Sequence, residues 1–311
     1  MLRFLRFVRD VFPLRIYATY AVLWTLGLEG SLRVLSGTAL HSDWCVASAT
    51  RAFSVLVTLL FLRIVDEQKD LEYDRVHHPE RPLVRGSITT RELQRAMACI
   101  AALLFALNAQ ISLAIIGVLA LDLAYAVFLL HLERRSRLVR EGLFLNLALT
   151  YPVQLLLSVY IVLSVRESVS ALRWADLVLL IGFAFAFLHF EFARKTAWMA
   201  DADQRFYSSV IGPRASAWLT AACAAGASAV VFLLFQPWRV SGEARLAALA
   251  PHASLLFVVC GGALFMLFRR PAWPKLYAMG FLLSFYIGLV VHAGVRASPR
   301  ETRLAPPASR S

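Results

Sequence analysis

The sequence predicts an all-α integral membrane protein, with about nine transmembrane helices in a bundle around a central apolar cavity. Hydrophobic residues make up 59% of the 311 residues, and the mean hydropathy is +0.64. Charged residues make up only 17%, whereas a soluble globular domain carries about a quarter. Long apolar runs recur from end to end, and many approach the roughly 20 residues that a helix needs to cross a bilayer.

The apolar runs divide into nine candidate spans. They cover roughly residues 14–37, 44–65, 93–109, 111–131, 143–164, 174–193, 215–236, 246–268 and 274–295. We therefore expect one transmembrane domain over residues 1–295 and a disordered tail over 296–311, where Pro, Ser and Arg are frequent. The four cysteines are scattered and form no CxxC pair, so neither a disulfide framework nor a cysteine metal cluster is indicated.

The net charge of +12 would suggest nucleic acid as a partner if the protein were soluble. Here most of the 32 Lys and Arg residues fall at the N-terminus and in the connections that follow even-numbered spans. The positive-inside rule makes that side cytoplasmic. We therefore expect no nucleic-acid partner, a bacterial inner (plasma) membrane location, and a functional site that faces the cytoplasm.

A charged stretch, DEQKDLEYDRVHHPERPLVRG, follows the second span. Its residues Asp66, Asp70 and Asp74 recur every four positions, so on a helix they lie above one another. Stacked carboxylates at a helix C-terminus repel one another, and the helix dipole adds to the repulsion. Such a stripe needs a cation, and its oxygen ligands suit Mg²⁺. The alternative is a solvated helix end, in which Lys69 pairs with the neighbouring acids.

Two arginines follow the acidic stripe, Arg81 and Arg85, with Pro82 between them to stiffen the loop. Arginines held in place are good ligands for phosphate. Carboxylates for a metal and arginines for an anion together indicate a diphosphate site. His77 and His78 are either further metal ligands or structural loop residues.

A second charged stretch, EFARKTAWMADADQRFYSS, follows the sixth span. Glu191 and Lys195 lie four residues apart at the predicted helix end, next to Arg194. Beyond the helix Asp201 and Asp203 follow, and then Arg205. Any basic loop at the membrane surface would have a similar composition. Four spans separate the two charged stretches, which suggests two similar halves whose loops face each other.

The first stretch resembles the aspartate-rich motif of the UbiA superfamily of intramembrane aromatic prenyltransferases. That motif reads roughly N/D-D-x-x-D-x-x-x-D and is followed by R-P-L/I-x-x-G. The matching residues here are DEQKDLEYD and then RPLVRG, at the end of the second span. Nine spans and a second charged motif after the sixth span also fit the family. The resemblance covers about residues 14 to 295.

The resemblance implies that Mg²⁺ and basic side chains hold a prenyl diphosphate at the cytoplasmic mouth. The metal ligands would be Asp66, Asp70, Asp74, Glu191, Asp201 and Asp203. The diphosphate would be bound by Arg81, Arg85, Arg194, Lys195 and Arg205. This chain departs from the family pattern at two places. Asp66-Glu67 stands where Asn-Asp is common, and Glu191 and Lys195 stand where two aspartates are usual, so we expect a divergent member.

The favoured hypothesis is therefore Mg²⁺-dependent transfer of a prenyl group from its diphosphate to an aromatic or lipid acceptor, with Asp66, Asp70, Asp74, Glu191 and Lys195 as catalytic residues. The partners would be prenyl diphosphate, an unidentified acceptor and membrane lipids. One alternative is a terpene cyclase of the same fold, which needs no acceptor. Another is a transporter or non-catalytic scaffold; a transporter should carry charges at mid-membrane. Few occur here, with Asp122 the main exception.

Overall fold

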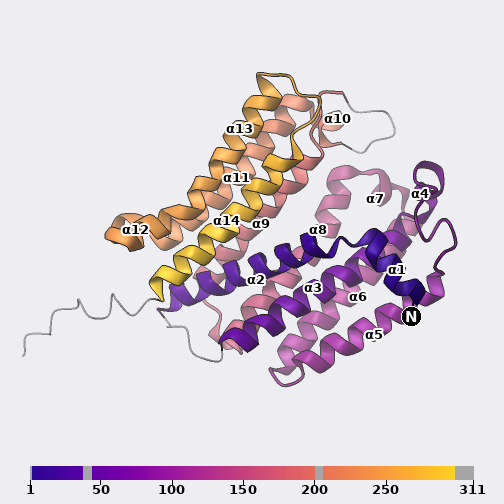
Figure 1. Ribbon diagram of the computed structural model, residues 1–311, viewed down its shortest axis with the longest axis horizontal. Coiled ribbons are helices and arrows are strands. Elements are labelled where there is room, and N and C mark those ends of the chain that lie inside the picture. The colour runs from indigo at the N-terminus through magenta and orange to yellow at the C-terminus, as the bar shows by residue number, and fades with distance from the viewer. Residues whose placement is uncertain (1, 38–43, 200–205, 298–311) are drawn as a thin grey trace, which may run out of the picture. The chain divides into compact units, whose positions relative to one another are not determined.

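The computed structural model describes residues 2–37, 44–199 and 206–297, and every regular element in these ranges is a helix (Figure 1). The one β-type pairing among them is an isolated antiparallel bridge between Ala197 and Ala272. The predicted all-α membrane fold is thus confirmed. The predicted tail lies outside the described residues from position 298 onward.

Long helices form at all nine predicted spans. They are α2 (Leu14–Ser36), α3 (Trp44–Lys69), α5 (Thr90–Asn108), α6 (Leu113–Arg135), α8 (Leu143–Arg166), α9 (Trp174–Arg194), α11 (Pro213–Phe235), the broken segment α12 (Gly242–Leu249), η3 (Ala250–Ser254) and α13 (Leu255–Met266), and α14 (Lys275–Arg296).

The predicted count of nine transmembrane spans is not confirmed. Within the described ranges, seven segments are long and apolar enough to cross a membrane, or eight if α1 (Leu2–Val11) and α2 together make one bent span. The helix α5 is not among them. Its first turns carry Arg91, Glu92 and Arg95, so its continuous apolar part is short.

The chain folds as two compact units. The first comprises residues 1–25, 46–173 and 200–212, and the second comprises residues 26–45, 174–199 and 213–311. The single domain predicted over residues 1–295 stays a prediction.

The core of the first unit is formed by apolar side chains of α1, α3, α5 and α6, among them Phe7, Phe61, Ile64, Leu93 and Leu123. A buried polar contact ties three of its helices together. The amide of Asn108 in α5 donates to Ser54 Oγ of α3 at 3.0 Å and accepts from the Tyr160 hydroxyl of α8 at 2.9 Å. Because each group finds a partner, this contact fixes the helix register without leaving a buried polar atom unsatisfied.

In the second unit, α9 packs against α11 and α14, and α13 packs along α14 (Figure 1). Small residues allow the close approach. A methyl group added at Gly288 of α14 would lie 2.5 Å from the Cα of Pro251 in η3. Helices in membranes use such small residues because packing, rather than the hydrophobic effect, holds them together.

Candidate functional site

The acidic stripe lies at the junction of α3 and the short helix α4 (Leu71–His77), in the first unit. The amide of Asp70 donates to the Asp66 carbonyl at 2.9 Å, and the amide of Asp74 donates to the Asp70 carbonyl at 2.8 Å. Helical hydrogen bonding therefore continues across the junction, as the four-residue spacing predicts. The three side chains nevertheless have different surroundings.

One of these carboxylates, Asp74, belongs to a buried ion network. Arg81 Nη1 lies 3.1 Å from Asp74 Oδ2 and 2.9 Å from Glu67 Oε1. Arg63 of α3 also donates to Glu67, whose side chain is fully buried. The predicted phosphate ligand Arg81 is thus already paired with two carboxylates, and it holds the loop after α4 against the end of α3.

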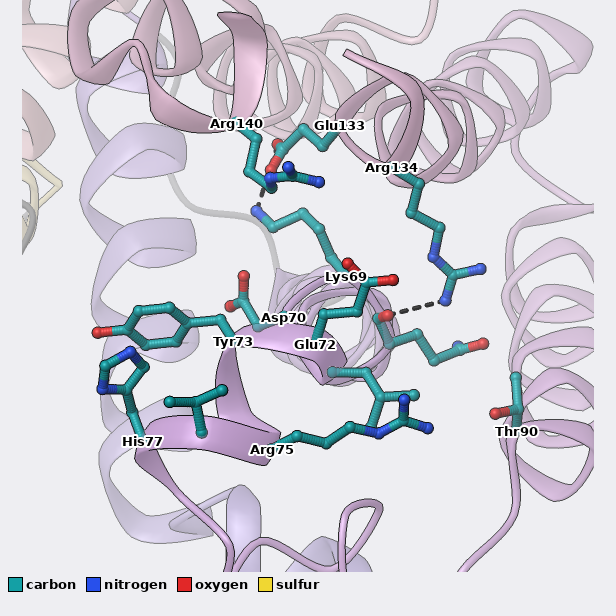
Figure 2. A pocket seen from close by; sticks show the side chains of 13 residues that line it. Lys69, Asp70, Glu72, Tyr73, Arg75, His77, Thr90, Glu133, Arg134 and Arg140 are labelled. Atoms are coloured by element: carbon teal, nitrogen blue, oxygen red, sulfur yellow. Dashed lines mark hydrogen bonds and ion pairs between the residues drawn. The ribbon is translucent and has the colours of Figure 1, made fainter. Parts of the chain in front are cut away.

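Asp70, in contrast, lines a pocket with a volume of about 640 Å³. Figure 2 shows the Lys69 side chain at the end of α3 pointing toward Glu133 of α6 and Arg140 of α7 (Arg137–Glu141), with Asp70 beside Tyr73 of α4. The basic residues of the pocket are Lys69, Arg75, Arg134 and Arg140, and the acidic ones are Asp70, Glu72 and Glu133. The pocket is therefore rich in charge of both signs.

Ion pairs and a hydrogen bond hold this pocket in shape. Lys69 Nζ lies 3.4 Å from Glu133 Oε1 and 3.4 Å from Asp66 Oδ1. Arg134 Nη2 donates to the backbone carbonyl of Gln68 at 2.8 Å, an interaction drawn as a dashed line in Figure 2. Asp66 itself is about half exposed, with 48% of its side chain accessible. It is thus available to a ligand that enters beside Lys69.

Burial raises the pKa of Asp70 to about 6. The ammonium of Lys69 lowers this pKa, whereas the carboxylates of Asp66, Asp74 and Glu133 raise it further. Burial also raises the pKa of Asp74, although Arg81 offsets part of this effect. A raised carboxyl pKa means that the negative charge is not fully compensated by its surroundings. Asp70 is thus a group whose charge a bound cation would stabilise.

The carboxylates fit Mg²⁺ only together with a phosphate ligand. No group of three or more His, Cys, Asp or Glu side chains lies close enough to hold a metal ion in the part of the chain that the structure describes. Proteins, however, usually bind Mg²⁺ through one or two carboxylates plus substrate phosphates. Asp70 at the pocket, with Asp66 near enough to raise its pKa, meets that smaller requirement.

The second charged stretch lies in the second unit. Glu191 at the end of α9 is held by two cations: Arg194 Nε donates to its Oε2 at 2.6 Å, and Lys195 Nζ lies 2.8 Å from its Oε1. The Lys195 side chain keeps 27% of its surface exposed. The other predicted ligands of this stretch, Asp201, Asp203 and Arg205, lie outside the described residues, so the predicted meeting of the two loops stays a prediction.

Sequence reasoning missed several residues of the site. Glu133, Arg134 and Arg140 come from the ERRSRLVRE stretch after the fourth span, which indicated only membrane topology. Arg63 lies within an apolar span, four residues before Glu67. The i,i+4 spacing of Arg63 and Glu67 was a usable signal for the buried pair. No comparable signal places α6 and α7 beside the end of α3.

This protein is thus an all-helical membrane protein with a charged pocket at the end of a spanning helix. Among solved structures, the chain is similar to a UbiA homolog from Aeropyrum pernix K1, with a TM-score of 0.54 and 17% identity over 89% of this chain and 96% of the other. It is also similar to a structure of digeranylgeranylglyceryl phosphate synthase, with a TM-score of 0.51 and 14% identity over 93% and 99% of the two chains. No family model and no curated protein matches the sequence. The chain therefore has the fold of these UbiA-type proteins.

Proposed function

We propose that this protein transfers a prenyl group from a prenyl diphosphate to an aromatic or lipid acceptor within the membrane. The observation that carries the proposal is the charged pocket, in which the incompletely compensated Asp70 lies among Lys69, Arg75, Arg134 and Arg140. The fold it shares with a UbiA homolog and with digeranylgeranylglyceryl phosphate synthase supports the same reaction class.

In this proposal the basic side chains bind the diphosphate. Arg134 and Arg140 present guanidinium groups from α6 and α7, and such groups can bind phosphate oxygens in a bidentate manner. Lys69, held between Glu133 and Asp66, adds a point charge. Fixed cations at the position where a leaving group gains negative charge lower the barrier to its departure.

The carboxylates Asp70 and Asp66 would hold Mg²⁺ that enters with the diphosphate. When bound, the ion would neutralise negative charge on the departing pyrophosphate. Asp74 and Arg81 then have a positioning role, because their pairing fixes the loop that follows α4. The metal-binding or phosphate-binding roles predicted for Arg85, Glu191, Arg194, Lys195, Asp201, Asp203 and Arg205 stay predictions.

The experiment uses the full chain, purified and reconstituted in lipid nanodiscs with Mg²⁺, a panel of radiolabelled prenyl diphosphates and a membrane lipid extract. We expect a prenylated product that requires the extract, identified by mass spectrometry. The Asp70→Asn variant should lose at least about 100-fold in turnover, as removal of a charge-stabilising group does in other enzymes. The matched control is Glu80→Gln, which removes an acid of the loop after α4 whose side chain is 71% exposed.

Each outcome is informative. A hydrocarbon or alcohol product formed without the extract would identify a cyclase instead of a transferase. Consumption of no diphosphate by the folded protein would contradict the proposal. Equal turnover in Asp70→Asn and the wild type would leave the acidic stripe as a solvated helix end.

A further inference from the structure

The N-terminal helix α1 has two different faces. Phe7 and Val11 are buried in the core of the first unit, and Phe4 packs against that core. The opposite face carries Leu2, Leu5, Arg6 and Arg9, at the spacing i, i+3, i+4 and i+7 that places residues on one side of a helix. All four are exposed, Leu2 at 72% and Leu5 at 54%. We call these four residues the α1 outer face.

The direction of α1 suits a helix at a membrane surface. Its axis makes an angle of 71° with the axis of α2, so α1 does not continue the direction of the apolar helix that follows it. Its ten residues include Arg3, Arg6, Arg9 and Asp10, and charged residues in the bilayer centre are costly. A helix that mixes exposed leucines and arginines lies in the interface, where leucines reach the acyl boundary and guanidinium groups meet lipid headgroups.

Both ends of α1 are bonded to the loop and network beside the pocket. At its start, Arg3 Nε donates to the Ser87 carbonyl at 3.0 Å, Nη2 donates to the Gly86 carbonyl at 3.2 Å, and Nη1 lies 3.3 Å from Glu92. At its end, the Val11 carbonyl accepts a hydrogen bond of 3.1 Å from Arg63 Nε.

These two attachments reach residues that hold the site together. Arg63 also binds Glu67, which binds Arg81 of the loop after α4. Gly86 lies in that loop with a φ of +72°, a conformation that favours glycine. A change in the position of α1 therefore acts on the loop from both sides.

We propose that the α1 outer face binds anionic phospholipid headgroups at the membrane surface, and that this contact steadies residues 81–92, which comprise the loop after α4 and the start of α5. The charge of Arg6 and Arg9 selects anionic over zwitterionic lipid, because each basic residue near an anionic surface gains attraction. The binding is independent of the proposed reaction, and it can be measured without substrate.

The test is hydrogen–deuterium exchange of the full chain in nanodiscs of phosphatidylcholine, with and without phosphatidylglycerol. We expect anionic lipid to slow exchange in peptides covering 2–11 and 81–92. Arg6→Ala with Arg9→Ala should weaken the response to anionic lipid: the fraction of phosphatidylglycerol that gives half of the full effect should rise by about tenfold or more. Arg6→Lys with Arg9→Lys should keep most of it. Arg239→Ala with Arg245→Ala, which removes two exposed arginines elsewhere, should not change it.

A further variant separates binding from its effect on the loop. Arg3→Ala should retain the slowed exchange in α1 but lose most of it at residues 86–92, because the bonds to Gly86 and Ser87 are gone. The proposal is wrong if the double alanine variant responds to phosphatidylglycerol as the wild type does. Exchange that is equally slow in pure phosphatidylcholine and with phosphatidylglycerol would also overturn the proposal, because the contact would then be apolar. Exchange that slows only after a soluble protein is added would overturn it by indicating a protein partner.

Discussion

At the scale of single residues, the Asp70 carboxylate destabilises the fold when charged, although the proposed function needs that charge. Burial and the neighbouring carboxylates raise its pKa to about 6, and Lys69 compensates only in part. Asp74, four residues later, is instead paired with Arg81 at 3.1 Å. Two aspartates of one stripe thus have different roles: one is held by the protein, and the other faces the pocket.

Without metal, we expect the Asp70 carboxyl to make the protein less stable as pH rises. Its folded pKa of about 6 lies above the ordinary value of 3.8, so the folded state holds the proton more tightly. The stabilisation is complete below about pH 4 and is lost as pH rises through about 6. Asp70→Asn should therefore be more stable than the wild type at pH 7, by about 3 kcal/mol at most.

Thermal unfolding in detergent with EDTA, between about pH 4 and 8, measures this effect. Adding Mg²⁺ and diphosphate should stabilise only the wild type, since a ligand stabilises the state that binds it. The exposed Glu80→Gln variant should keep the wild-type profile. Identical pH profiles for Asp70→Asn and the wild type would show that Asp70 is fully compensated.

Lys195 is the second residue with a specific prediction. Its ammonium shares Glu191 with Arg194, so Glu191 keeps one cation when Lys195 is removed. If Lys195 binds diphosphate oxygen, Lys195→Ala should weaken binding of a non-hydrolysable prenyl diphosphate analogue by about tenfold, a typical loss for one charge-assisted contact. The loss should persist at saturating Mg²⁺, because a lysine acts without the metal.

Isothermal titration of the folded variants gives the answer. Lys275→Ala, at the exposed start of α14, is the matched control for a lysine that only reaches toward the membrane surface. Unchanged affinity in Lys195→Ala would show that Lys195, like Lys275, only reaches toward the membrane surface.

At the scale of elements, close contacts between helices place the site and hold the second unit together. The helix α3 continues to Lys69, past the predicted end of the apolar span at residue 65, and so brings Asp66 and Lys69 to one end of a rigid element. In α14, a glycine allows close packing against a neighbouring element. Gly288 lies against the backbone of η3, which is itself a short 3-10 helix between α12 and α13.

We expect Gly288→Ala to destabilise the protein by about 1–3 kcal/mol, as overpacking typically does. The added methyl group would lie 2.5 Å from both the N and Cα atoms of Pro251, and backbone atoms cannot rotate away. Gly294→Ala in the same helix meets no atom within 4 Å. It should be neutral or stabilising, since alanine favours a helix over glycine by about 1 kcal/mol. Thermal unfolding of the two variants in detergent compares them, and equal midpoints would contradict the packing argument.

At the scale of the whole molecule, the distribution of Lys and Arg predicts how the chain is oriented in the membrane. Position 78 follows α4 and is partly exposed, with 44% of the His78 side chain accessible. Ser168, also exposed, follows α8 at the opposite end of a predicted span. The positive-inside rule places the first position in the cytoplasm and the second outside.

In a background without the native cysteines, His78→Cys should therefore resist a membrane-impermeant maleimide added to intact cells. Ser168→Cys should react readily, and both should react after the membrane is opened. Ready labelling at position 78 in intact cells would reverse the topology and place the pocket on the other side of the membrane.

The sequence alone determined the helical membrane class, the positions of the long apolar helices, and the acidic stripe with its arginine loop. These features are local, because apolar length, four-residue spacing and the Arg-Pro pattern all lie within short stretches. The sequence also predicted a site role for Arg81, which stays a prediction, although its partners Glu67 and Asp74 are visible only in the fold.

Only the tertiary structure decided which charges meet. Lys69 pairs with Glu133, 64 positions later in the chain, and Arg134 binds the Gln68 carbonyl. Arg3 reaches residues 86, 87 and 92 from the N-terminus. Such contacts depend on how helices distant in the sequence pack together, and side-chain periodicity within one helix contains no information about its neighbours. For the same reason the pocket, unlike the stripe beside it, could not be predicted from the sequence.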